Sequence, residues 1–343
     1  MSERSAVASS SHGRTVVVLG TMLAVGLTSY VLWSDRERFL EVVVRGPRWW
    51  ALAMAVVFTG CVSPAVAWRW QLLLGGAGVP FCYRDVYRLV VQSNVANMLL
   101  PIPITGGGDA AKAALLATMT TAKTQSISTI VVDRVLGLTS LLAVGAVAGI
   151  AGWRLIGASL HFLTTICLLL ALIIPTVMWA ACSEVGRKTC AWTFRIHHRL
   201  ASISRQIELV MEAYRSQPRL LVSAIAIGML GQTLTVAAFA LCAAAIGIDG
   251  NKIATLFVCA PFVFISTALP LPYGALGVAE EVAEQLLRID GVAGGGIIMI
   301  AYRCTQTAST CLLAMFETAA GLFRRNHATQ RAIGGLSEEV THD

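Results

Sequence analysis

Several stretches of the chain are apolar, almost free of charge and about 20 residues long, which is the feature that most constrains the fold. The stretch from Trp49 to Trp68 has no charged residue and a tryptophan at each end. An α-helix needs about 20 apolar residues to cross a bilayer, and tryptophan is enriched at both membrane interfaces. Only 13% of the 343 residues are charged, about half the share in a soluble domain. The sequence therefore predicts an all-α polytopic membrane protein and argues against disorder, a disulfide scaffold and nucleic-acid binding.

Six stretches are predicted to be full transmembrane helices: residues 15–33, 49–68, 130–152, 155–183, 220–248 and 291–323. The first is interpreted as a retained span, because no small-residue cleavage site follows it. Together they would form one transmembrane domain over residues 15–323, with tails at 1–14 and 324–343.

Basic residues predict the orientation of these spans. The segment 184–219 holds seven Lys and Arg residues against three Glu residues, and such segments stay in the cytoplasm. The segment after the second span, with Arg69, Arg84 and Arg88, is assigned to the same side. Both termini are then expected in the cytoplasm.

Two further apolar regions, 86–121 and 253–287, are interrupted by proline and glycine. The first contains Pro101 and Pro103, and the second contains Pro270 and Pro272. Proline ends a helix, and broken backbone at membrane depth is tolerated only inside protein or beside a water-filled cavity. Each region is either a re-entrant hairpin or a pair of full crossings, so six and ten crossings both remain open.

The two breaks resemble each other at a constant offset of 169 residues. Leu100-Pro101-x-Pro103 followed by Gly108 matches Leu269-Pro270-x-Pro272 followed by Gly277. One break follows an outside-to-inside span and the other an inside-to-outside span. This predicts an inverted repeat with halves at 49–152 and 220–323, joined by the basic linker 184–219. Matched breaks in inverted repeats point to a substrate site near the bilayer midplane.

Charged residues near the breaks are the candidate site, because charge inside a membrane is costly and usually functional. Asp109 and Lys112 share a helical face, and Asp133-Arg134 is interpreted as the opening of the next span. The glycine turn before Asp109 suits a phosphate, unless Asp109 caps those amides or pairs with Lys or Arg. The predicted substrate-binding residues are Asn97, Gly107, Gly108, Asp109, Lys112, Asp133, Arg134, Gly277, Glu280, Glu281 and Arg303. No catalytic residue, metal site or cofactor is predicted.

Other polar residues in the apolar regions receive structural interpretations. Glu284 and Arg288 are interpreted as a solvated i,i+4 pair, and Glu317 as a surface residue at the cytoplasmic boundary. His161 and Gln232 are each expected to be satisfied by a backbone carbonyl.

Four motifs together resemble a known family. Asn97-x-x-Leu100-Pro101 followed by Gly107-Gly108-Asp109-x-x-Lys112 resembles a signature of the lysylphosphatidylglycerol-synthase transmembrane, flippase-like family. Val131 to Leu138, the block from Leu269 to Glu280, and Tyr302-Arg303 resemble its later blocks. The resemblance covers about residues 15–325. Two positions depart from it: Lys112 stands where the family usually has Arg, and Ala279 where it often has a basic or polar residue.

The resemblance implies a lipid translocator of the bacterial inner membrane. Its substrate would be a phospholipid, aminoacyl-lipid, polyprenyl-phosphate or hopanoid. The chain looks like the flippase domain of the multiple peptide resistance factor without its soluble aminoacyltransferase domain, so it is not expected to be an enzyme. The alternatives are a non-catalytic partner of a cell-envelope lipid or glycan biosynthesis enzyme, and a membrane-embedded glycosyl or lipid transferase. A homo-oligomer is a further alternative.

Overall fold

The computed structural model describes residues 22, 26, 29–30, 33, 36–99, 107–181, 214, 217–248, 250–267 and 275–339. Within these residues the regular structure is helical and no strand is present. The helices are α2 (Arg36–Arg45), α3 (Trp49–Gly76), α4 (Tyr83–Leu99), α5 (Gly107–Met119), α6 (Lys123–Ala151), α7 (Ala158–Ala181), α10 (Pro218–Ala245), the short 3-10 helix η1 (Gly250–Lys252), α11 (Ile253–Ser266), α13 (Val278–Arg288) and α14 (Gly295–Glu339). The predicted all-α polytopic membrane fold is confirmed.

Four helices in the described part of the chain are long and apolar enough to cross a membrane. They cover Trp49–Gly76, Gln125–Ala151, Ala158–Met178 and Pro218–Ala245, and they match four of the six predicted spans. The first predicted span lies almost entirely outside the described residues. The last is helical within α14, but it carries Arg303 and Glu317 and does not meet the same criteria, so its crossing stays a prediction.

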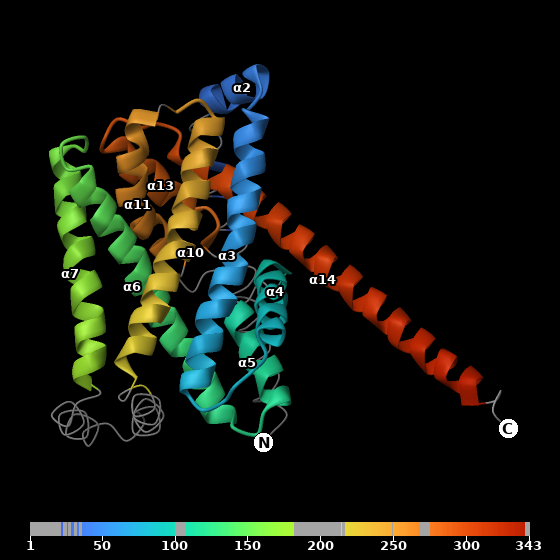
Figure 1. Cartoon of the computed structure of the whole chain (residues 1–343). Helices are drawn as coiled ribbons and strands as arrows, with labels where there is room; N and C mark the ends of the chain where they lie inside the picture. The colour runs from blue at the N-terminus through green and yellow to red at the C-terminus, as the bar shows by residue number, and fades with distance from the viewer. Residues whose placement is uncertain are drawn as a thin grey trace, which may run out of the picture.

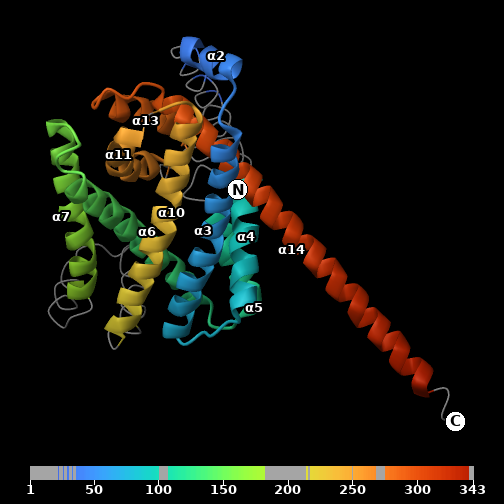
Figure 2. The same ribbon diagram turned by 45° about the horizontal axis from the view of Figure 1, so that its top comes forward.

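Helices α3 and α10 form the centre of the molecule and pack against each other more extensively than any other pair. Figure 1 shows them side by side, with α6 and α7 on one flank and α4, α5 and α14 on the other. Small residues permit this approach, since a Cβ added to Gly231 would lie 3.7 Å from that of Ala65. Figure 2 shows that α14 leaves this bundle and runs outward over its C-terminal part.

Two helical hairpins flank this centre. Helix α4 packs on α5, and α11 packs on α13. The first hairpin follows α3 and the second follows α10, and Figure 1 shows that they enter from opposite ends of the bundle. These helices have 17, 13, 14 and 11 residues, short of the ~20 of a full crossing. Their lengths favour re-entrant hairpins. The proline breaks at 101, 103, 270 and 272 lie outside the described residues.

The helix contacts follow the order that an inverted repeat predicts. Helix α3 packs on α4 and α6, as α10 packs on α11 and α14. Between the halves, α14 packs on α3 and α4, as α6 packs on α10 and α11. Each of these four contacts of one half has a counterpart in the other, which supports the repeat, although the repeat itself remains a prediction.

The two isolated polar residues behave as expected. The ring nitrogen Nε2 of His161 lies 2.9 Å from the carbonyl oxygen of Trp153. Gln232 Nε2 donates to the carbonyl oxygen of Gly137 at 3.4 Å. Both predicted backbone-carbonyl contacts are confirmed.

Candidate functional site

An ion pair joins the helix after the first break to the span that follows it. Asp109 lies in the first turn of α5, and its carboxylate pairs with the guanidinium of Arg134 in α6. The expectation that Asp133 and Arg134 open a span is wrong, because α6 begins at Lys123. Arg134 therefore lies eleven residues inside the helix, roughly 16 Å from its start. Asp109 could have capped the amides of the glycine turn or paired with a Lys or Arg, and in the structure it pairs with an arginine.

A second ion pair has the same place in the other half. Glu280 lies in the first turn of α13, and its carboxylate pairs with Arg303 of α14. The Glu280 side chain is 0% exposed, and the backbone N–H of Gly277 also donates to it at 2.5 Å. Gly277 has a φ of +86°, a conformation that favours glycine. The glycine turn thus sets the position of the buried carboxylate.

The two arginines are related by the offset of the two breaks. Arg134 and Arg303 are 169 residues apart, as are Gly108 and Gly277. In each half, the arginine pairs with a carboxylate in the first turn of the helix after the break. The sequence left open that Asp109 pairs with a Lys or Arg and that Glu280 or Glu281 is a counter-ion for one of the arginines. In the structure, Asp109 pairs with Arg134 and Glu280 pairs with Arg303.

Lys112 faces a different helix from Asp109. Its side chain is buried, and the ammonium lies 5.0 Å from the ring centroid of Trp70 in α3. A cation at that distance from an aromatic face is attracted to it. The indole N–H of Trp70 donates to Thr129 at 3.0 Å, which holds the ring. Among the described residues Lys112 has no carboxylate partner, so it provides a positive charge within the first hairpin.

Asp133 belongs to a third ion pair, which the sequence did not predict. Arg69 Nε lies 2.7 Å from Asp133 Oδ1, and the side chains are only 7% and 9% exposed. Glycines give the guanidinium its space, since a Cβ on Gly228 or Gly137 would lie 3.1 or 3.3 Å from it. The prediction that Arg69 belongs to the segment after the second span is wrong, because Arg69 is buried within α3. The signal for its real role was Asp133 itself, because a buried carboxylate needs a cation.

Gly108 allows the first hairpin to close tightly. A Cβ at this position would lie 2.7 Å from the carbonyl oxygen of Ser93 and 3.2 Å from the Cβ of Asn97. Asn97, a predicted binding residue, is exposed and lies beside the start of α5. Gly107 is the first residue of that helix. The predicted cluster of Asn97, Gly107, Gly108 and Asp109 is therefore contiguous in space.

The remaining acidic residues of α13 point in different directions. Glu281 is half-buried and accepts a hydrogen bond from Gln285 at 2.7 Å. The interpretation of Glu284 as solvated is wrong, because its side chain is 4% exposed. It pairs with Arg288 and accepts the N–H of Gly296 at 3.0 Å. Glu284 thus caps the start of α14, where free amide groups favour a carboxylate.

The arrangement suits the binding of anions. Guanidinium groups bind phosphate and carboxylate with the same planar hydrogen-bond geometry, so Arg134 and Arg303 can exchange one for the other. Within the described part of the chain, no group of three His, Cys, Asp or Glu side chains has metal-site geometry.

Comparison with known proteins agrees with this membrane architecture. No curated protein matches the chain. The family described as "Lysylphosphatidylglycerol synthase TM region" matches residues 17–314, which include all four residues of the two ion pairs. The chain therefore belongs to the lysylphosphatidylglycerol synthase transmembrane-region family.

Proposed function

We propose that this protein is a lipid translocator that moves a lipid with a phosphate-bearing headgroup between the leaflets of the bacterial inner membrane. One observation carries the proposal: each hairpin has a carboxylate–arginine pair at the helix that follows its break. Charged groups placed within a membrane protein at this cost usually line a substrate path.

The ion pairs provide a way to hold and release an anionic headgroup. Without lipid, Asp109 and Glu280 neutralise Arg134 and Arg303. For the fully buried Glu280, this pairing avoids an uncompensated charge away from water. A lipid phosphate replaces the carboxylate at the guanidinium. Lys112 lies three residues from Asp109 and adds a second cation to the first half.

We call the Asp109–Arg134 pair and the Glu280–Arg303 pair the two half-sites. In this proposal they open toward opposite leaflets. The first hairpin enters from the end of the bundle at which α7 ends and α10 begins, and the second enters from the other end (Figure 1). In the sequence, the basic segment 184–219 joins α7 to α10. Positively charged loops stay in the cytoplasm, so we place the α4–α5 hairpin on the cytoplasmic side, together with both termini. A headgroup passed from one pair to the other would cross the midplane, as in other carriers built from inverted repeats.

Leaflet exchange in proteoliposomes tests the proposal. The purified chain is reconstituted with headgroup-labelled phosphatidylglycerol, lysyl-phosphatidylglycerol or a polyprenyl phosphate, and the loss of outer-leaflet label is followed. Exchange above that of empty vesicles is expected for at least one lipid, and Arg303→Gln should remove it. Arg45→Gln, on the exposed helix α2, is the matched control and should retain it. No exchange with any of these lipids would overturn the proposal.

A further inference from the structure

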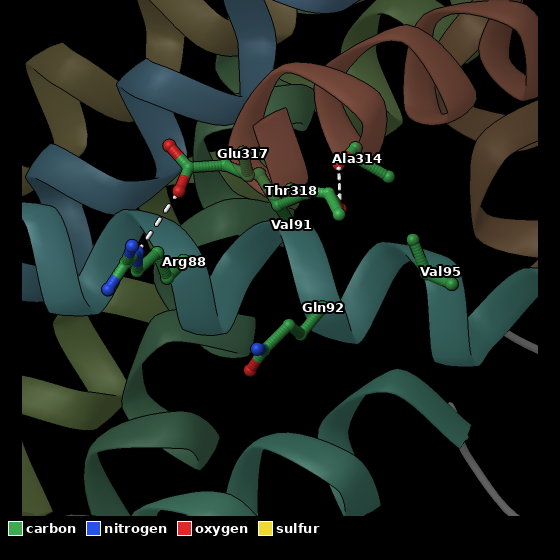
Figure 3. Close-up of a pocket in the computed structure, with 7 residues that line it drawn as sticks. All are labelled: Arg88, Val91, Gln92, Val95, Ala314, Glu317 and Thr318. Atoms are coloured by element: carbon green, nitrogen blue, oxygen red, sulfur yellow. Dashed lines mark hydrogen bonds and ion pairs between the residues drawn. The ribbon is translucent and has the colours of Figure 1, made fainter. Parts of the chain in front are cut away.

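A pocket of about 400 Å³ lies between α4 and α14, away from the two ion pairs. Its lining comes from one stripe of each helix: Arg88, Val91, Gln92 and Val95 of α4, and Ala314, Glu317 and Thr318 of α14. Figure 3 shows the seven lining side chains on the two helices, with Arg88 and Glu317 joined by a dashed line. The volume is in the range of small-molecule sites, about 300–1,000 Å³.

The pocket holds an ion pair at one end, and three apolar side chains together with Gln92 and Thr318 line the rest of it. Arg88 Nε lies 3.1 Å from Glu317 Oε2 (Figure 3). Val91, Val95 and Ala314 provide the apolar walls. The interpretation of Glu317 as a simple surface residue is incomplete, because its side chain is 25% exposed and bridges the two helices. A charged end and an apolar wall match the two parts of a phospholipid.

The surroundings identify the bilayer as the source of the occupant. Met315 and Phe316, next to the lining residues of α14, are largely exposed. Large apolar side chains on the outside of a membrane protein face lipid tails. The pocket therefore lies beside a surface that contacts acyl chains.

We propose that this pocket admits one phospholipid from the bilayer, with its phosphodiester at Arg88 and an acyl chain against Val91, Val95 and Ala314. The inference rests on the proposed function, because it names the route by which the lipid reaches the half-sites. A single ion pair with both side chains partly exposed is weak. A phosphodiester can therefore take the place of Glu317 at the guanidinium.

Both walls of the pocket continue to predicted binding residues. Along α4, Asn97 lies nine residues beyond Arg88, roughly 14 Å at the helical rise. Along α14, Arg303 lies fourteen residues before Glu317, roughly 21 Å away. A phospholipid held at Arg88 thus lies on the same two helices as the candidate site.

Photolabelling of the full chain in nanodiscs tests the headgroup contact. The probe is phosphatidylglycerol with a diazirine on one acyl chain, and labelled peptides are mapped by mass spectrometry. The α4 and α14 lining peptides should be labelled about tenfold more by this probe than by the matching diacylglycerol, which lacks the phosphate. Arg88→Gln should abolish that preference, and Arg88→Lys should keep it. Equal labelling by both probes in the wild type would overturn the inference.

A space-filling substitution tests the pocket itself. Val95→Trp should remove the lining labels, whereas Val177→Trp, on the exposed surface of α7, should not. Unchanged labelling in Val95→Trp, or labels spread evenly over α7, would show ordinary surface lipid and overturn the pocket. Pocket labelling without leaflet exchange would instead overturn only the proposed function. If Val95→Trp abolishes labelling of the pocket but leaves lipid exchange between the leaflets undiminished, only the entry route through the pocket is overturned.

Discussion

Arg69 and Asp133 form an ion pair buried between α3 and α6, with 2.7 Å between Nε and Oδ1. A carboxylate removed from water raises the free energy of the folded state unless a cation compensates it. Arg69 provides that cation, and glycines of α6 and α10 leave room for its guanidinium. The pair therefore anchors α6 in the interior of the protein, directly beside the exposed Arg134.

Removing one partner of this pair should destabilise the protein strongly. Asp133→Asn leaves Arg69 buried without its counter-charge, which costs about 3–5 kcal/mol. Thermal unfolding of the purified protein in detergent measures the loss. Glu41→Gln, which breaks the exposed Arg45–Glu41 pair on α2, is the control and should leave the melting temperature unchanged. A melting temperature of Asp133→Asn equal to the wild type would contradict the role of Arg69.

The Glu280–Arg303 pair should separate stability from transport. Glu280→Gln should lower lipid exchange about tenfold or more, since a hydrogen bond to a charged group is lost. The swapped variant Glu280→Arg/Arg303→Glu restores an ion pair and should regain part of the stability. It should not regain exchange, because a carboxylate then stands where the phosphate must bind. Recovery of exchange by the swapped variant would indicate a purely structural pair.

Gly108 should tolerate no side chain. The Cβ of Gly108→Ala would lie 2.7 Å from the Ser93 carbonyl oxygen, so the α4–α5 hairpin must spread, at a cost of about 1–3 kcal/mol. Gly75→Ala is the matched control, because nothing lies within 4 Å of its added Cβ. Gly108→Ala should therefore have a lower melting temperature than Gly75→Ala. Equal melting temperatures would argue against close packing of the hairpin.

Asp290, in the loop between α13 and α14, should produce a pH dependence of stability. Burial would raise the pKa of Asp290, but hydrogen bonds from Thr255 and Lys252, the Lys252 charge and the N–H of Gly157 hold it below the ordinary 3.8. A lowered folded-state pKa means that the stabilisation is complete above the unfolded-state pKa. It is lost as the pH falls through the folded-state pKa.

Unfolding measured from pH 7 to pH 2 checks this prediction. The wild type should lose stability below about pH 4, the region of an ordinary aspartate pKa. Asp290→Asn should be less stable at pH 7 and should show a smaller acid-induced loss. An equal loss of stability at low pH in both proteins would show that other carboxylates cause the effect.

Hydropathy predicted four long apolar helices, and it gave the correct start for α3 at Trp49 but not for α6. The stretch 130–152 marks the apolar part of α6, whereas the helix starts at Lys123. Polar residues such as Ser126 and Thr129 fit within it because their hydroxyls donate to the carbonyl oxygens of Ala122 and Ser126. Hydropathy reports the surroundings of a residue, and helix ends depend on backbone hydrogen bonds, so the two boundaries differ.

The partners in the candidate site were harder to predict than its members. The scarcity of charge singled out Asp109, Arg134, Glu280 and Arg303. Their pairing depends on how each hairpin packs on the next helix, which a spacing of 25 or 23 residues does not reveal. Glu284 was misinterpreted for the same reason. Its i,i+4 partner Arg288 is evident from the sequence, but its contact with the start of α14 is not.

Asp133 and Arg134 are neighbours on α6 that bind in two directions, one to Arg69 of α3 and the other to Asp109 of α5. A rotation of α6 large enough to free Arg134 would also strain the buried pair beside it. The two contacts are therefore expected to change together, because packed interiors switch between discrete arrangements. The release of Arg134 from Asp109 would then be cooperative. Helices α3, α5 and α6 would change their contacts in one step, and Arg134 would not loosen gradually by itself.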